Sequence, residues 1–206
     1  MAISIKNSSI KNSHFGPTLV TPVDLIFYVD AANRKSYPGS GTTWTDLIGG
    51  NTGTIDGATF SGSEMGIFDL DGVNDHVDFS TSSDFAFGTG ANGWGMWYES
   101  SNKLGFRYAG GSPIQTGSAP SLNEWYIFQL TFEHSTKDWV WYLNDDVSNS
   151  GTTSMSIPSS GNETDMCIGN WCHTGGREIN GDIGFISVYG RPLTSSEVSQ
   201  NFNLLI

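Results

Sequence analysis

The chain has 206 residues, of which 37% are hydrophobic and 13% aromatic, and these proportions exclude a disordered chain and fit one globular domain. Its formal net charge of −12 argues against nucleic acid as a partner, because phosphates attract Lys and Arg. No apolar run is long enough to span a membrane, and 26 glycines among few charged residues are typical of short strands joined by tight turns.

The first 22 residues differ from the rest in composition. They contain Lys6 and Lys11 but no acidic residue, and their few isoleucines cannot bury a core. We therefore divide the chain into an N-terminal anchoring arm, residues 1–22, and one domain, residues 23–206. The arm is expected to pair with a sheet edge or a neighbouring chain, which predicts a homo-oligomer or a larger assembly. It lacks the apolar stretch of a secretory signal, so we expect synthesis in a cytoplasm.

Alternating apolar and polar residues predict antiparallel strands along most of the domain. Residues 44–48 are expected to form a short helical turn, and the Gly-rich residues 49–57 a connection. Asn144 and Asp145 are expected to form a two-residue hairpin turn, because both tolerate left-handed φ. The predicted strands cover residues 25–32, both arms of a strand-turn-strand unit at 66–80, and residues 94–98, 104–108, 125–134, 138–143, 166–169 and 179–189.

A helix is expected to end the chain. Thr194 stands at its N-cap and Glu197 three residues later, which is the pattern of a capping box. Val198, Phe202 and Leu205 recur at helical spacing, so we expect this stripe to pack on the strands.

Three segments resemble the motifs of one family, in that family's order. They are FDLDGVNDHVDF at residues 68–79, the opening strand and loop at 25–50, and the closing strand and helix at 179–202. The chain is thus similar to laminin-G-like jelly-roll domains of the concanavalin A-like lectin/glucanase superfamily. The resemblance implies an all-β fold, a two-sheet antiparallel jelly-roll sandwich with a short C-terminal helix.

The opening and closing motifs resemble those of virion proteins of tailed bacteriophages. This implies a non-enzymatic structural protein, either a capsid decoration or a tail-fibre component. Its partners would be other virion proteins, bound through the N-terminal arm, and host-surface glycans, bound by the exposed jelly roll. The alternative is a secreted or cell-surface carbohydrate-binding lectin module.

Catalysis is not expected. Glycoside hydrolases with this jelly roll use clustered carboxylates on one strand, as in Glu-x-Asp-x-x-Glu, and the sequence has no such pattern. Asp69 and Asp71 are two residues apart, but we assign them to the backbone of the turn motif.

Asp71, Asn74 and Asp75 are candidate calcium ligands. Laminin-G-like and lectin relatives bind calcium at loop tips, and calcium takes about six to eight oxygen ligands. The interpretation we favour is that these side chains hydrogen-bond the backbone of their own turn. No other cofactor is expected.

Trp171, His173 and Asn170 are candidate glycan-binding residues. They lie in the Gly-rich stretch GNWCHTGGRE, where an aromatic ring stands beside an amide and an imidazole. Trp94 and Trp97 are alternatives. For any one of the seven tryptophans, packing in the core is the simpler interpretation.

The two cysteines, Cys167 and Cys172, lie in CIGNWC. A disulfide is compatible with this spacing if the segment turns. We favour two free thiols, as expected for a protein made in a reducing compartment. Zinc is excluded because His173 is the one further ligand nearby.

Overall fold

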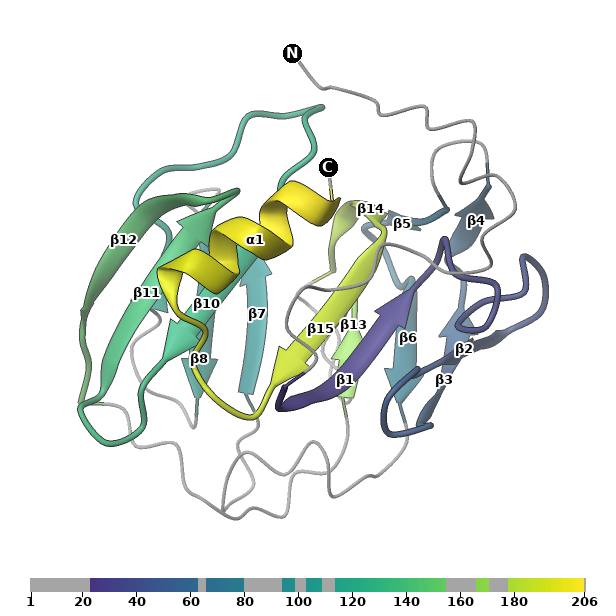
Figure 1. The fold of residues 1–206 in the computed structure, drawn as a ribbon. Helices are drawn as coiled ribbons and strands as arrows, with labels where there is room; N and C mark the ends of the chain where they lie inside the picture. Colours follow the sequence, from purple (N-terminus) through teal and green to yellow (C-terminus); the bar gives the residue numbers. More distant parts are fainter. Residues whose placement is uncertain are drawn as a thin grey trace.

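A computed structural model describes residues 23–62, 66–79, 94–98, 103–108, 114–154, 166–170 and 178–205. The predicted anchoring arm, residues 1–22, lies outside the described residues. The described strands pair antiparallel throughout and form the expected jelly-roll sandwich, with one helix near the C-terminus (Figure 1).

One half of the sandwich contains the strands of the motif at 66–80 and both ends of the domain. Hydrogen-bonded neighbours in its three sheets follow the strand orders β1-β15, β14-β5-β4 and β13-β6-β3-β2. The first two groups are joined, because only Gly184 separates β14 from β15 and its carbonyl accepts a bond from Ala31 N–H at 2.9 Å. The strands are β1 (Leu25–Asp30), β2 (Thr43–Thr45), β3 (Thr52–Asp56), β4 (Thr59–Ser61), β5 (Ile67–Asp71), β6 (His76–Phe79), β13 (Met166–Ile168), β14 (Asn180–Ile183) and β15 (Phe185–Tyr189).

The other half consists of two three-stranded sheets that face each other. The buried side chains of Trp139 and Trp141 pack between them, and Trp141 Nε1 donates to the carbonyl of Ile114 at 3.2 Å. This bond ties the two sheets together across the core. The strands are β7 (Trp94–Tyr98), β8 (Leu104–Tyr108) and β9 (Ile114–Gln115), opposite β10 (Phe128–Phe132), β11 (Asp138–Leu143) and β12 (Asp146–Thr152).

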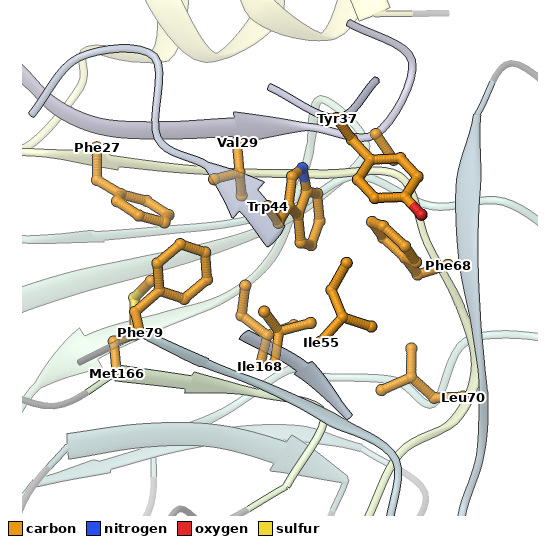
Figure 2. Packing of buried hydrophobic residues seen from close by; sticks show 12 residues of the cluster. Phe27, Val29, Tyr37, Trp44, Ile55, Phe68, Leu70, Phe79, Met166 and Ile168 are labelled. Atoms are coloured by element: carbon orange, nitrogen blue, oxygen red, sulfur yellow. The ribbon is translucent and has the colours of Figure 1, made fainter. Parts of the chain in front are cut away.

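The main core lies in the first half, between β1 and the β6–β13 pair. Figure 2 shows Phe27 and Val29 of β1 directed toward Phe79, Met166 and Ile168. The rings of Phe27 and Phe79 meet edge to face, with centroids 5.1 Å apart and an angle of 86°. The period-two alternation predicted from the sequence holds in β6, where Val77 and Phe79 are buried, whereas β1 buries residues on both of its faces.

Two predicted segments differ from the structure. Residues 44 and 45 belong to the strand β2 and are followed by a turn rather than a helix, and residues 49–57 are not only a connection, because they contain β3, which pairs with β2. Gly53 explains why β3 was missed. A Cβ atom at this position would lie 2.6 Å from the ring of Phe79, so only glycine lets that ring rest against the strand.

A buried carboxylate fixes the chain directly after β2. Asp46 is 2% exposed, and its Oδ1 accepts the backbone N–H groups of Tyr28 at 2.9 Å and Ile48 at 3.0 Å. Its Oδ2 accepts Gly49 N–H at 2.9 Å and Asn51 Nδ2 at 2.8 Å. Four donors thus satisfy one carboxylate, which ties β1 to the turn after β2.

The helix α1 (Ser195–Leu205) begins with the predicted capping box. Glu197 N–H donates to Thr194 Oγ1 at 3.3 Å, and Thr194 N–H donates to Glu197 Oε2 at 2.8 Å. Arg191 adds two bonds to the same carboxylate, at 2.9 and 2.6 Å, and also contacts Asp24 at 3.3 Å. The bonds from Arg191 and from Thr194 lower the pKa of Glu197 to about 2.

The helix connects the two halves of the sandwich. Val198 is fully buried, and its carbonyl accepts Gln129 Nε2 of β10 at 3.4 Å. Asn201 donates to the hydroxyl of Tyr189, on β15, at 3.2 Å. In Figure 1 the helix extends from in front of β10 and β11 toward β14 and the adjoining end of β15. No helix among the described residues is long and apolar enough to cross a membrane.

The predicted apolar stripe of this helix is only partly correct. Val198 is buried as expected, but Phe202 is half-buried, and the side chain of Leu205 lies outside the described residues. Asn201, 3% exposed, takes the inner position, because its amide has the Tyr189 hydroxyl to bond.

Candidate functional site

The three predicted calcium ligands lie on the turn between β5 and β6. Asp71 Oδ1 accepts the backbone N–H groups of Val73 at 2.8 Å and Asn74 at 3.4 Å. Asp75 Oδ2 accepts Asp71 N–H at 2.9 Å. These carboxylates therefore hold the turn together, which is the role we favoured from the sequence.

The geometry of this turn gives calcium few free oxygens. Asp75 is 8% exposed, and its Oδ1 lies against Gly57, where no side chain would fit. Within the described part of the chain, no group of three acidic, His or Cys side chains is placed to hold a metal ion. Calcium binding at Asp71, Asn74 and Asp75 remains a prediction that needs oxygens from elsewhere in the chain.

The structure brings one predicted glycan-binding residue next to this turn. β13 pairs with β6 up to the partners Ile168 and Val77, and the ladder leads Gly169 and Asn170 toward the turn. A Cβ atom on Gly169 would lie 3.0 Å from the carbonyl oxygen of Asp75. Asn170 therefore lies at the same end of the sandwich as the turn that holds Asp71, Asn74 and Asp75.

The remaining residues of the predicted glycan site lie outside the described ranges. These are Trp171 and His173. The side chains of the alternatives, Trp94 and Trp97, also lie outside what the structure describes.

The preference for free thiols was wrong. Cys167 is disulfide-bonded, and the one other cysteine of the chain is Cys172. The backbone supplies the turn that this short spacing requires, because Gly169 has a φ of 93° directly after β13. The sequence showed the glycine but not its conformation.

A hollow of about 520 Å³ opens beside the hairpin between β11 and β12. We call it the hairpin hollow. Gly117 N–H donates to Ser148 Oγ at 3.1 Å, and Asn149 Nδ2 donates to the carbonyl of Gln115 at 2.9 Å. These bonds hold the segment after β9 against β12. The hollow is lined by Gly117, Ser118, Leu143, Asn144, Asp146, Val147 and Ser148.

An exposed tryptophan, Trp125, lies on the chain segment that leads to the hairpin hollow. Asn144, a lining residue, accepts Ile127 N–H at 3.1 Å and donates its own N–H to the Ile127 carbonyl at 2.8 Å. Trp125 precedes Ile127 by two residues, which places their Cα atoms within about 7 Å of each other. Its side chain is 52% exposed, and Val147 on the lining is 60% exposed.

The sequence analysis missed Trp125 as a site residue because it placed Trp125 inside a strand at 125–134. The strand β10 begins only at Phe128. Asn123, with a φ of 63°, turns the chain just before it. The stretch Pro-Ser-Leu-Asn-Glu ahead of the tryptophan is the signal that marks this loop.

The hairpin hollow combines hydrogen-bonding groups with apolar surface. The Ser148 hydroxyl has a proton to donate, the Asn144 amide has its NH₂ group, and Asp146 presents an exposed carboxylate. Leu143 and Val147 add apolar surface. The hollow's volume of about 520 Å³ lies within the roughly 300–1,000 Å³ usual for small-molecule sites, and the hollow is open to solvent rather than enclosed.

Comparison with known families matches residues 70–199, more than half of the chain, to the family described as "Concanavalin A-like lectin/glucanases superfamily". A comparison with curated proteins finds no match.

Similar solved structures share the fold at low sequence identity. The Trypanosoma rangeli sialidase in complex with sialic acid has a TM-score of 0.61 and 14% identity, over 87% of this chain and 32% of the sialidase. The binding domain of Paraclostridial Mosquitocidal Protein 1 has a TM-score of 0.64 and 16% identity, over 87% of this chain and 52% of that one. Domain 4 of AbnA, an extracellular arabinanase from Geobacillus stearothermophilus in complex with arabinotriose, has a TM-score of 0.57 and 14% identity. That match covers 86% of this chain and 98% of the domain, whereas the chain spans only about a third of the sialidase.

Proposed function

Because the chain belongs to the concanavalin A-like lectin/glucanases superfamily, we propose that it is a non-enzymatic glycan-binding domain. The observation that carries the proposal is the hairpin hollow, together with the exposed Trp125 on the loop that leads to Ile127, which is bonded to Asn144 of the lining. Two of the similar structures support it, since one is a binding domain and another is a domain in complex with arabinotriose.

The hollow fits a sugar in its chemistry as well as its size. The C–H face of a sugar ring packs on an aromatic ring, and the sugar hydroxyls need both donors and acceptors. Trp125 supplies the ring, while Asn144, Asp146 and Ser148 supply the polar groups.

We propose binding without cleavage. Glycosidic cleavage needs two carboxyl groups about 5–10 Å apart across the sugar bond. Asp146 is the one carboxylate among the described residues that line the hollow. Incubation with a broad panel of polysaccharides is expected to give no new reducing ends. Turnover that one Asp or Glu substitution abolishes would contradict the proposal.

The setting we propose is the surface of a bacteriophage particle, as a capsid decoration or part of a tail fibre. The resemblance of the opening and closing motifs to virion proteins supports this setting. In it, residues 1–22 attach the domain to other virion proteins or to copies of itself, and the hairpin hollow meets the glycans of the host surface.

A second setting, a secreted or cell-surface lectin, is favoured by the disulfide at Cys167. Disulfides form and persist in oxidising surroundings and are rare in the cytosol. Detection of the protein in purified phage particles would decide for the first setting, and its detection in culture medium without particles would decide for the second.

A glycan array probed with the full chain tests the proposed function. We expect Trp125→Ala to weaken binding about tenfold or more, while Trp125→Phe keeps most of it, because a smaller aromatic ring still stacks. Trp171→Ala, made in parallel, tests the site predicted from the sequence. Leu122→Ala is the control, since Leu122 is 88% exposed on the same loop.

The variants separate the two candidate sites. Loss of binding in Trp171→Ala with none in Trp125→Ala would move the site to the loop after β13. Circular dichroism of each variant shows whether the fold is retained.

A further inference from the structure

We infer that the hairpin hollow selects neutral sugars and rejects acidic ones such as sialic acids, uronic acids and sulfated sugars. This inference rests on the proposed glycan-binding function and specifies its ligand class. The charges and hydrogen-bonding groups around the hollow support it.

The charges near the hollow are mostly negative. Asp146 is the one ionisable side chain among the described lining residues, and it is exposed. Asp145 adjoins it at the tip of the hairpin, and Glu124 adjoins Trp125, each with an exposed side chain. The whole chain carries a net charge of −12. An anionic ligand would therefore approach a negative surface and come to rest against a carboxylate.

Lys103 is a cation near the segment that contributes Gly117 and Ser118 to the hollow. Lys103 precedes Leu104, whose N–H donates to Thr116 Oγ1 at 3.2 Å, and the Leu104 carbonyl accepts Thr116 N–H at 3.0 Å. These bonds place the Lys103 backbone next to the segment that enters the hollow at Gly117. Lys103 is not among the lining residues, and three carboxylates outnumber it.

The free hydrogen-bonding capacity also favours a neutral sugar. The carboxylate of Asp146 accepts hydrogen bonds, and the hydroxyl groups that a neutral sugar presents on every side can donate to it. A carboxylate or sulfate on the ligand is itself only an acceptor and would leave both groups without a proton between them. Because Asp146 is exposed, solvent weakens the repulsion between the two anions but does not remove it.

The experiment compares sugars that differ only in charge. The full chain is titrated with lactose and its sialylated form, and with polygalacturonate in its methyl-esterified and free-acid forms. We expect the neutral member of a pair to bind at least about fivefold more tightly than the acidic member at low ionic strength. The ratio should shrink as salt is added, because these charges are exposed and the Debye length is about 10 Å at 0.1 M.

Two substitutions test the origin of the selectivity. Asp146→Asn should lower the neutral-to-acidic ratio, and Asp146→Lys should bring it to about one or below. Asp69→Lys is the matched control, because Asp69 is also an exposed carboxylate and lies on β5, in the other half of the sandwich. We expect it to leave the ratio unchanged.

The outcomes separate the inference from the proposed function. Acidic sugars that bind as tightly as their neutral partners, or a ratio that Asp146→Lys does not move, would overturn the inference while glycan binding stands. Binding of no sugar of either class on the wider array would refute the glycan-binding function itself, and the inference with it.

Discussion

Replacement of Asp46 by Asn tests how the opening motif holds the fold. The substitution keeps the shape of the side chain but turns one acceptor oxygen into an NH₂ donor. The amide oxygen is expected to face the buried Tyr28 N–H, and the NH₂ group then faces two donors, Gly49 N–H and Asn51 Nδ2. Two hydrogen bonds are lost and donors oppose donors.

The magnitude follows from these two bonds. A hydrogen bond to a charged group contributes about 1.5–3 kcal/mol, but Gly49 is exposed and water can replace part of its bond. We therefore expect Asp46→Asn to lower the free energy of unfolding by about 2–4 kcal/mol. For a chain of this size the melting temperature falls by about 2–4 °C per kcal/mol, which gives a decrease of about 5–15 °C.

Urea and thermal unfolding of the full chain, followed by tryptophan fluorescence, measure the effect. Asp69→Asn is the control, because Asp69 is exposed and lies opposite Asp182 in the β5–β14 ladder. Removal of one of two facing like charges is expected to leave stability unchanged or slightly raised. If both variants unfold at the same urea concentration as the unsubstituted chain, the bonds to Asp46 do not stabilise the fold and the reasoning is refuted.

Three further predictions concern the helix, the core and the arm. Glu197→Gln should lower the free energy of unfolding at neutral pH. The difference from the unsubstituted chain should disappear as pH falls from about 4.5 toward 2, because the folded pKa of Glu197 lies below the usual 4.5. A difference in urea midpoint that stays constant over this range would contradict the prediction. Trp141→Phe should lower the free energy of unfolding by about 1–2 kcal/mol more than Trp44→Phe does. Both indoles are fully buried, but of the two only Trp141 Nε1 has a hydrogen-bond partner among the described residues. Equal losses of stability in chemical denaturation would show that the bond to Ile114 contributes nothing. Deletion of residues 1–22 should leave the melting temperature of the domain nearly unchanged. It should abolish oligomerisation, measured by light scattering, or incorporation into particles, measured by particle binding. Normal assembly of the truncated chain would place the attachment surface on the sandwich.

The sequence by itself determined the sandwich and its helix. Period-two alternation placed Phe128, Leu130 and Phe132 on the inner face of β10, and Trp139 and Trp141 on the inner face of β11, as the core cluster shows. These features are local, since a strand's buried face and a helix cap depend on residues a few positions apart.

The tertiary structure alone decided features that depend on contacts between distant segments. From the sequence, Gly53 is expected in a loop. In the structure it lies in a strand, because the ring of Phe79 occupies the space that a side chain would need. From the sequence, Asn201 is expected to face outward. In the structure it faces inward, because its amide bonds the hydroxyl of Tyr189 on β15. The disulfide at Cys167 likewise depended on a backbone turn that the order of residues does not state.

The candidate site shows the same division. The sequence directed attention to aromatic residues in a Gly-rich loop and to acidic residues in a tight turn, because their chemistry is visible without a fold. The hairpin hollow is formed by Gly117 and Ser118 from one segment and by the β11–β12 hairpin from another. The loop that carries the exposed Trp125 is tied to that hollow because Ile127 pairs with Asn144 across 17 residues of chain. Hollows between segments are set by packing, so no pattern along the chain could have located this one.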